Sequence, residues 1–552
     1  MNNNHSTTRR EFIVQAGAGT AAAVVAGTFV RRAVAAPAAA SAYLTSKDTS
    51  TDPQFVSATR IAQMIREKQI SAVDAVKACY ARIDQVNPTI NAVVAFCRQR
   101  ALAEAKLADE ALAAGKILGP LHGVPFTIKD SFDTEGVVST GGTLGRKDFI
   151  PGKDATVVAR VRKAGGILLG KTNTPEFTLG GGARGTYNLV YGQTYNPYKA
   201  KYNPSGSSGG AGAIVAAGGS YFDIGSDYGG SIRGPAFANG IAGIKPTLGR
   251  SPRTGHIVGY GGAFDTFQET GPLARRVEDL YLLLGIIGGP DAADGAMAPV
   301  PLGDPAKVDL KKLRIAYYLT DGFNSVNDPT PQIQDLIKQS VGYFSALGAK
   351  VTADRPPHMK ELAAARKEFS SADGGDHMRR LLKKHGTTQA SPGLNEGTGI
   401  ELPSADFTRL CEEMDALKSE QLAWLEQYDL IICPAAKESA QPVPPEFKRE
   451  PGADGGGYTS EYNTTGWPGG VVRVGTSPEG LPLGVQIVGQ PWHDDVVIAA
   501  LSYIEGKTGG WQKPPILRPC GRQCLAGCKP CGRQCLAGCK PCGPQALPAA
   551  SP

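Results

Sequence analysis

The chain has 552 residues, of which 41% are hydrophobic and 20% are charged. This composition excludes disordered, collagen-like and coiled-coil proteins, and the length allows several domains or one large α/β domain. The formal net charge of +7 belongs to the two ends, because residues 1–36 and 518–552 hold far more Lys and Arg than acidic residues. The remaining body is nearly neutral, so nothing in its charge predicts binding to nucleic acid or to an anionic membrane.

Residues 1–36 are predicted to be an export signal. The segment Thr8-Arg9-Arg10-Glu11-Phe12-Ile13 matches the twin-arginine pattern, and a mildly apolar stretch follows it. That stretch is too short and too weakly hydrophobic for a membrane-spanning helix, although an uncleaved anchor and a chance basic pair remain alternatives. We therefore expect a periplasmic or secreted protein with no membrane association once the signal is removed.

The other end is a cysteine-rich repeat, in which an 11-residue sequence at 520–530 recurs at 531–541. Two C-x-x-C pairs have the spacing of a zinc site, but no His or carboxylate lies nearby, so a disordered tail is the favoured interpretation and no metal is predicted. These pairs are Cys528/Cys531 and Cys539/Cys542. The predicted organisation is thus a signal (1–36), a linker (37–52), one catalytic domain (53–512) and a tail (513–552).

The elements expected along the body alternate between helices and strands. Residues 53–116 are predicted to be helical, with Ser71-x-x-Asp74 as a capping box, a break at Pro88 and a further helix over 92–114. Short apolar runs then predict strands, and amphipathic runs predict helices between them. The strands are expected at 124–128, 166–170, 430–433 and 483–488, and the helices at 155–164, 211–217, 330–350 and 406–428. This alternation predicts an α/β fold with a mixed sheet.

Residues 203–247 carry the chemistry. Gly229-Gly230-Ser231 places a hydroxyl beside two residues without Cβ, where backbone N–H groups can approach a ligand oxygen. A serine nucleophile needs a base, and the histidines of the body lie in no suitable motif. Lys129 follows an apolar strand, and burial there would lower the pKa of its amine toward neutrality. Taken singly, each residue has a plainer interpretation: a surface lysine, loop hydroxyls at Ser207 and Ser208, and a helix N-cap at Ser231.

Several motifs together resemble the amidase signature family over roughly residues 55–505. They include Val124-Pro-Phe-Thr-Ile-Lys129-Asp130, Gly206-Ser207-Ser208-Gly209-Gly210 and Gly229-Gly230-Ser231-Ile232-Arg233. The resemblance implies the amidase signature fold, with a large mixed central β-sheet covered by helices on both faces. It also implies a catalytic triad in which Ser231 is the nucleophile, Lys129 is the base and Ser207, after a cis peptide bond, bridges them.

The same resemblance assigns further roles around the triad. The backbone amides of Tyr228, Gly229, Gly230 and Ser231 match an oxyanion hole, and Ser208 matches a supporting serine. Asp227 and Arg233 are interpreted as a buried charge pair that holds this loop. The implied reaction is hydrolysis of a small-molecule amide to a carboxylate plus ammonia or amine, through an acyl-enzyme on Ser231, with no metal or organic cofactor.

The sequence departs from the family pattern at three positions near the site, and it leaves other functions open. Ser205 and Tyr228 stand where many members have Gly and Thr, and Ala211 where Ser or Glu is frequent. A His-dependent serine hydrolase is one alternative, with G-x-S-x-G centred on Ser208 and with His493 followed by Asp494 or Asp495. Another is the glutaminase-type subunit of a tRNA-dependent amidotransferase, which requires a partner. The amide itself stays undetermined, and a homodimer stays open.

Overall fold

The computed structural model describes residues 46–179, 184–259, 266–394, 399–445 and 458–515. The predicted signal lies outside this range, as does all but the first three residues of the predicted tail. Of the predicted linker, residues 46–52 are described and form no helix or strand. Glu278 accepts hydrogen bonds there from the Ser46 hydroxyl (2.5 Å) and the Lys47 amide (2.7 Å), so these residues are attached to the body. The domain boundaries themselves stay predictions.

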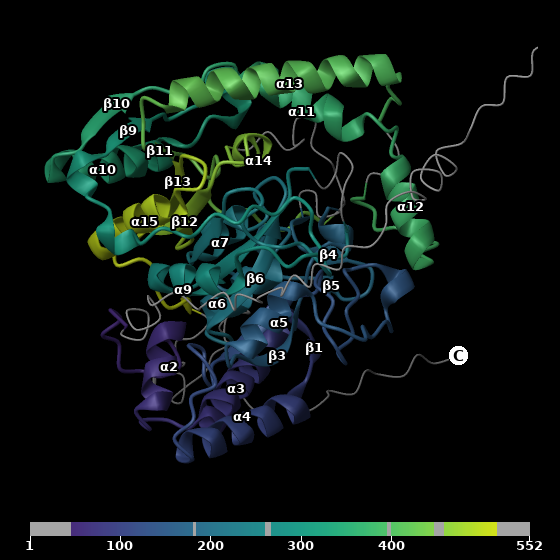
Figure 1. Cartoon of the computed structure of the whole chain (residues 1–552), viewed down its shortest axis with the longest axis vertical. Coiled ribbons are helices and arrows are strands. Elements are labelled where there is room, and N and C mark those ends of the chain that lie inside the picture. The colour runs from purple at the N-terminus through teal and green to yellow at the C-terminus, as the bar shows by residue number, and fades with distance from the viewer. Residues whose placement is uncertain (1–45, 180–183, 260–265, 395–398, 446–457, 516–552) are drawn as a thin grey trace, which may run out of the picture. The chain divides into compact units, whose positions relative to one another are not determined.

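A mixed β-sheet forms the centre of the described part of the chain (Figure 1). Its eleven strands are β1 (Val93–Phe96), β2 (Pro125–Lys129), β3 (Ile167–Thr172), β6 (Phe222–Asp227), β7 (Ala242–Lys245), β8 (Glu269–Ala274), β9 (Arg314–Tyr317), β10 (Lys350–Ala353), β11 (Leu430–Cys433), β12 (Gly469–Thr476) and β13 (Pro482–Gly489). They lie in the order β1-β3-β2-β6-β8-β7-β12-β13-β11-β9-β10. Strand β2 is parallel to both β3 and β6, and β9 is parallel to β10 and β11, whereas the other pairs are antiparallel. A separate hairpin joins β4 (Tyr187–Asn188) to β5 (Gly192–Gln193).

Helices cover both faces of this sheet. They are α2 (Ala58–Arg66), α3 (Ala72–Ile90), α4 (Arg98–Ala113), α5 (Thr156–Lys163), α6 (Gly209–Ala217), α7 (Arg233–Asn239), α9 (Val277–Ile287), α10 (Pro331–Leu347), α11 (Met359–Ser371), α12 (Asp376–His385), α13 (Ser404–Leu425), α14 (Glu461–Thr464) and α15 (Asp494–Thr508). Gly243 of β7 faces α7, while Gly470, which pairs with Ile244, faces Leu501 of α15. Since neighbouring residues of a strand point to opposite faces, α7 and α15 lie on opposite sides of the sheet. The predicted fold class is confirmed.

The first helical segment differs from the prediction at two points. Helix α3 continues through Pro88 to Ile90 because the Asn87 side chain bonds the amides of Ala92 (2.7 Å) and Val93 (2.9 Å), which stabilises the last turn. The helix expected over 92–114 begins only at Arg98, because residues 93–96 form β1 on the edge of the sheet. That strand depends on its pairing with β3, which local sequence does not encode.

The remaining predicted elements lie close to the observed ones. The four strands agree within one or two residues with β2, β3, β11 and β13, and the helices agree within three residues with α5, α6, α10 and α13. The four cysteines of the body, Cys79, Cys97, Cys411 and Cys433, are free thiols. Among the described helices, none combines the length and the apolar character needed to cross a bilayer.

Candidate active site

The candidate site lies at the edge of the sheet where two parallel strands end side by side. Lys129 is the last residue of β2, and β6 ends at Asp227. Parallel neighbours bring their carboxyl ends to the same edge, which is where α/β sheets generally bind ligands. The segment from Tyr228 to Ile232 then connects β6 to α7. Thus the topology brings Lys129 and Ser231 into one region although they are about a hundred residues apart.

Lys129 is fully buried and lies against two serines. Its Nζ is 2.7 Å from Ser207 Oγ and 3.0 Å from Ser226 Oγ, and it donates more weakly to the Ser226 carbonyl at 3.4 Å. Burial lowers the pKa of Lys129 to about 7, against the opposing pull of Asp227 and Asp223. An amine with such a pKa is neutral in a large part of the molecules at pH 7, and only a neutral amine can accept a proton.

Ser207 contacts this lysine, and its neighbour Ser208 contacts the loop that carries Ser231. The Gly206–Ser207 peptide bond is cis, and Ser207 lies just before α6. The amide of Ser208 donates to the Ser231 carbonyl at 3.1 Å, which joins the two loops directly. Ser208 is buried, and its hydroxyl contacts the Ser226 carbonyl at 3.4 Å. Ser231 itself is only half-buried, and it does not cap α7, whose N-cap is Ile232.

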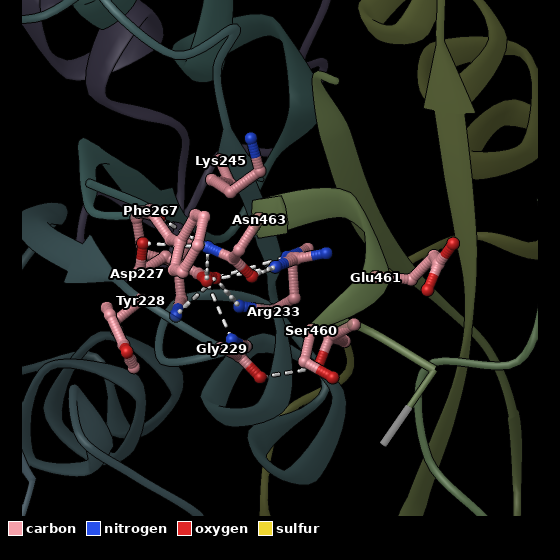
Figure 2. Close-up of polar contacts among 12 residues, drawn as sticks. Asp227, Tyr228, Gly229, Arg233, Lys245, Phe267, Ser460, Glu461 and Asn463 are labelled. Atoms are coloured by element: carbon pink, nitrogen blue, oxygen red, sulfur yellow. Dashed lines mark hydrogen bonds and ion pairs between the residues drawn. The ribbon is translucent and has the colours of Figure 1, made fainter. Parts of the chain in front are cut away.

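Asp227 and Arg233 form a buried ion pair at the base of the same loop. Their side chains are 0% exposed, and Asp227 accepts from Arg233 Nε at 3.1 Å and Nη2 at 2.9 Å. Figure 2 shows Asn463 directed at the same carboxylate, and its Nδ2 donates to Asp227 Oδ1 at 3.0 Å. Burial opposes ionisation, but Arg233 and these hydrogen bonds hold the pKa of Asp227 well below its usual value. The pair therefore acts as a rigid, charged support for the loop.

One amide of the expected oxyanion hole, that of Gly230, is engaged within the protein. The Gly230 amide donates to Asp227 Oδ1 at 2.7 Å, so it faces the carboxylate and not the site. The side chain of Asp227 turns back beneath the loop and captures this donor, along with the amide of Ile232 (3.0 Å). In the described part of the chain, the amides of Gly229 and Ser231 donate to no protein acceptor. These two amides suit a developing negative charge in a way that the Gly230 amide does not.

A family model described as Amidase matches residues 74–498, which is most of the chain and includes every site residue above. The chain belongs to the amidase family. It is therefore an enzyme of the amidase class, and this prediction is confirmed.

Named relatives of this amidase carry out several amide reactions. It is 34% identical to fatty-acid amide hydrolase 2-A of Danio rerio over 498 residues, covering 83% of this chain and 90% of the relative. It is 30% identical to a glutamyl-tRNA(Gln) amidotransferase subunit of Moorella thermoacetica, covering 84% of this chain and 99% of the relative. Among solved structures, 6-aminohexanoate cyclic dimer hydrolase complexed with substrate matches with a TM-score of 0.75 at 25% identity, covering 85% of this chain and 100% of that one.

Sequence reasoning missed two residues of the amidase that connect to Lys129. Ser226 Oγ lies between Lys129 Nζ and His256 Nε2, at 3.0 Å from each. His256 in turn contacts the Gln268 amide group at 3.0 Å through Nδ1. Burial, Lys129 and Arg253 lower the pKa of His256 well below its usual value, so its ring is neutral. No motif marked this histidine, because it reaches Lys129 only through the pairing of distant segments.

Tyr228, the unusual residue of the loop, is attached to α11. Its hydroxyl contacts Ser370 Oγ at 2.8 Å, and its ring packs against Phe267 with 6.1 Å between centroids. The guanidinium of Arg366 lies over the Tyr228 ring, 4.9 Å from its centroid. No motif in the sequence marks Ser370 or Arg366, since both reach Tyr228 through the position of α11.

The His-dependent alternative does not fit the structure. A nucleophile elbow on Ser208 requires a preceding strand, but residues 203–208 form none, and Tyr202 makes only an isolated bridge to Pro442. Asp494 is paired with Arg250 (2.7 Å). Within the described ranges, no group of three or more His, Cys, Asp or Glu residues has the arrangement of a metal site. The cysteine pairs of the tail lie outside these ranges.

Proposed function

We propose that this amidase hydrolyses a small carboxylic acid amide to the carboxylate plus ammonia or an amine, through an acyl-enzyme on Ser231. The observation that carries the proposal is the contact of 2.7 Å between the buried amine of Lys129 and Ser207 Oγ. The lowered pKa of Lys129 supports a role as the base, and the half-buried Ser231 is accessible to a substrate.

Acylation begins with a proton relay. Ser231 Oγ attacks the amide carbonyl carbon while its proton passes to Ser207 Oγ, and the Ser207 proton passes to Lys129 Nζ. Negative charge develops on the carbonyl oxygen, where the amides of Gly229 and Ser231 are suited to receive it. The C–N bond then breaks, and the nitrogen leaves with a proton that returns from Lys129 through Ser207.

Deacylation uses the same relay with water as the nucleophile. Water adds to the acyl carbon and gives a proton through Ser207 to Lys129. The bond between the acyl carbon and Ser231 Oγ breaks, and Ser231 recovers its proton from Lys129 through Ser207. The carboxylic acid departs and gives its remaining proton to solvent, which leaves the carboxylate. Each group is thereby restored for the next turnover.

The testing experiment is product release from a panel of amides, with ammonia, anilines and aliphatic amines assayed separately. Benzamide, an amino-acid amide, p-nitroacetanilide and a cyclic amide dimer cover the leaving groups. We expect at least one of them to be hydrolysed, and Ser231→Ala to lower kcat about 10⁴-fold or more. Comparable turnover by Ser231→Ala, with an unchanged circular dichroism spectrum, would contradict the assignment of the nucleophile.

A second candidate function is a glutaminase subunit of an amidotransferase, since an amidotransferase subunit is 30% identical over nearly its whole length. Such a subunit would release ammonia from glutamine only with its partner. Native mass measurement separates this state from a monomer or homodimer. Ammonia release from glutamine that requires a co-purifying second chain would favour the glutaminase.

We also propose that the protein is exported by the twin-arginine route to the periplasm or beyond. The pattern from Thr8 to Ile13 supports this, as does the small-residue segment Ala33-Val34-Ala35. N-terminal sequencing of the protein recovered from the periplasm tests it. Replacing Arg9 and Arg10 by Lys should retain the protein in the cytoplasm, whereas unchanged export would contradict the proposal.

A further inference from the structure

Arg366 connects helix α11 to the loop that carries Ser231. Its Nη2 donates to the Tyr228 carbonyl at 2.7 Å. Its Nη1 donates to the Ser460 carbonyl at 2.5 Å and contacts Thr464 Oγ1 at 3.2 Å. All three acceptors are neutral oxygens. A guanidinium thus holds together the loop after β6, helix α11 and the segment around α14.

The contact with Tyr228 involves both its backbone and its side chain. Besides the carbonyl, the Tyr228 ring lies under the Arg366 guanidinium, which is also 5.0 Å from the Phe267 centroid. The Tyr228 hydroxyl meets Ser370, one turn further along α11. Nη2 of Arg366 would lie 3.5 Å from a Cβ placed on Gly229, so the helix approaches the loop closely. Because the contacts come from two residues of one helix, α11 fixes the orientation of the Tyr228 peptide.

This orientation matters because the Tyr228 carbonyl and the Gly229 amide belong to one planar peptide group. A cation that donates to the carbonyl oxygen withdraws electron density from the peptide group. Its N–H then becomes a stronger donor, and its direction is fixed. The Gly229 N–H is one of the two amides suited to the oxyanion, so the effect of Arg366 reaches the reacting carbonyl through a single peptide group.

The next peptide group offers an internal comparison. The Gly229 carbonyl accepts from Thr459 Oγ1 at 2.7 Å, as Figure 2 shows by a dashed line from Gly229. Its N–H, however, is that of Gly230 and is donated to Asp227. The carbonyls of Tyr228 and Gly229 are therefore both held by side chains from outside the loop. Of these two, only the Tyr228 carbonyl belongs to a peptide group whose N–H is left for a substrate.

We propose that Arg366 is a positioning residue that orients and polarises the Tyr228–Gly229 peptide for stabilisation of the oxyanion. This inference rests on the proposed function, because it assumes that Ser231 attacks and that an oxyanion forms. The hydrogen bonds of Arg366 go to Tyr228, Ser460 and Thr464, and within the described ranges none involves Ser231. It lies in a helix far along the chain from the motifs, so the catalytic loop depends on an element outside the family motifs.

The test uses an alkyl fluorophosphonate, a probe that needs no knowledge of the substrate. Ser231 Oγ bonds to phosphorus, the P–F bond breaks, fluoride leaves, and the serine proton passes through Ser207 to Lys129. The second-order rate of labelling of the full chain is followed by mass spectrometry. The variants are Arg366→Met, Arg366→Lys, Thr459→Val and Lys360→Met, the last removing an exposed charge from the same helix.

We expect Arg366→Met to label about 10–100-fold more slowly, since it weakens one oxyanion donor. Arg366→Lys should recover part of the rate, while Thr459→Val and Lys360→Met stay within about threefold of the unsubstituted protein. The pH midpoint of labelling should not move, because Lys129 sets it, and burial, Asp227 and Asp223, which shift the pKa of Lys129, are unchanged in these variants. A general loss of packing would slow Thr459→Val equally or shift the midpoint.

The inference would be overturned by labelling of Arg366→Met within twofold of the unsubstituted protein, or by an equal loss in Thr459→Val. Should Arg366→Met fail to fold, Arg366→Lys carries the test: we expect a severalfold slower rate with an unchanged midpoint, and an unchanged rate would overturn the inference. Absence of Ser231 labelling in the unsubstituted protein would overturn the proposed function and this inference with it. Labelling of Ser231 at the normal rate in both the unsubstituted protein and Arg366→Met would overturn this inference but not the proposed function.

Discussion

Lys129 illustrates how burial makes a base from a residue that is normally charged. A lysine in water has a pKa near 10.4 and is protonated at neutral pH. In this enzyme, burial lowers the pKa to about 7, although Asp227 and Asp223 act in the opposite direction. The two nearby carboxylates limit the shift, and the serines at 2.7 and 3.0 Å direct the amine. The residue is thus kept close to the point where it can both take and return a proton.

The pH dependence of activity follows from this pKa. We expect kcat/KM to rise with pH through a midpoint near 7, because the neutral amine is the active form and is lost as pH falls. Lys129→Met and Lys129→Arg should both lower kcat/KM by at least about 10³-fold, since Met has no base and Arg stays protonated. The measurement is a pH–rate profile. An acidic limb that persists in Lys129→Met would assign the titration to another group.

The tautomer of His256 decides which ring nitrogen donates a hydrogen bond to Ser226. The Val258 amide, which can only donate, lies 3.4 Å from Nδ1 of His256. Nδ1 is therefore the acceptor in the neutral ring, and Nε2 carries the proton toward Ser226 Oγ. Ser226 is thereby held in place beside Lys129 without an additional charge.

Replacing His256 tests this role. His256→Leu removes the donor, and we expect kcat/KM to fall about five- to tenfold, in line with the loss of one hydrogen bond. His256→Gln can still donate from its amide and should retain most of the activity. Steady-state kinetics at pH 8 provide the comparison. Equal losses in both variants would indicate that the ring only fills space.

At the scale of elements, α6 positions the bridging serine by packing closely on its neighbours. The helix starts two residues after Ser207 and consists of small and aliphatic residues that are all buried. A Cβ on Gly210 would lie 2.4 Å from the backbone nitrogen of Asn173 and 2.8 Å from the Ala92 carbonyl oxygen. Only glycine allows this approach, because backbone atoms cannot move aside as a flexible side chain can.

Gly210→Ala should therefore displace α6. We expect the free energy of unfolding to fall by about 1–3 kcal/mol, as for other overpacked positions. kcat/KM should fall at least about tenfold, because Ser207 moves with the helix. Gly285→Ala is the matched control, since Gly285 lies in α9 with nothing within 4 Å of its Cβ position. Alanine there should be neutral or stabilise by up to about 1 kcal/mol. The measurements are urea unfolding and steady-state kinetics of both variants. If Gly210→Ala behaved like Gly285→Ala, the close packing of α6 would not have the importance assigned to it.

At the scale of the whole molecule, Arg233 joins segments that are far apart in sequence. It pairs with Asp227 after β6, donates to Gln486 Oε1 of β13 at 2.8 Å, and bonds Asn463 of α14. Gln486 in turn donates to the Tyr458 carbonyl at 2.8 Å. The active-site loop is thereby connected to β13 and to α14 by groups that are almost completely buried.

Arg233→Met should leave Asp227 buried without its charge partner. We expect a loss of about 3–5 kcal/mol in the free energy of unfolding at pH 7. The pKa of Asp227 is lowered in the folded protein, so its contribution is present above the unfolded value of 3.8 and is lost as pH falls. The difference in the free energy of unfolding between Arg233→Met and the unsubstituted protein should therefore become smaller below about pH 4. A loss under about 1 kcal/mol at pH 7 would contradict the importance of this pair.

Local sequence patterns predicted the elements whose own residues form a clear apolar pattern. One example is the strand at 430–433, which matches β11. They failed at β1, because an edge strand forms through its partner, and at Pro88, where the contacts of Asn87 stabilise the last turn. At the site, the motif positions of Lys129, Ser207 and Ser231 proved to share one edge of the sheet. The sequence did not predict that the Gly230 amide donates to Asp227, since the direction of this amide depends on how the Asp227 side chain lies under the loop.

The sequence by itself determined the fold class, the membership of the amidase family and the residues that meet at the end of β2 and β6. It could do so because apolar periodicity and catalytic motifs are local properties of the chain. The tertiary structure alone decided which amides face the site and that His256 and Arg366 reach it. These contacts arise where segments far apart in sequence pack together, and burial there sets both the pKa of Lys129 and the direction of each donor.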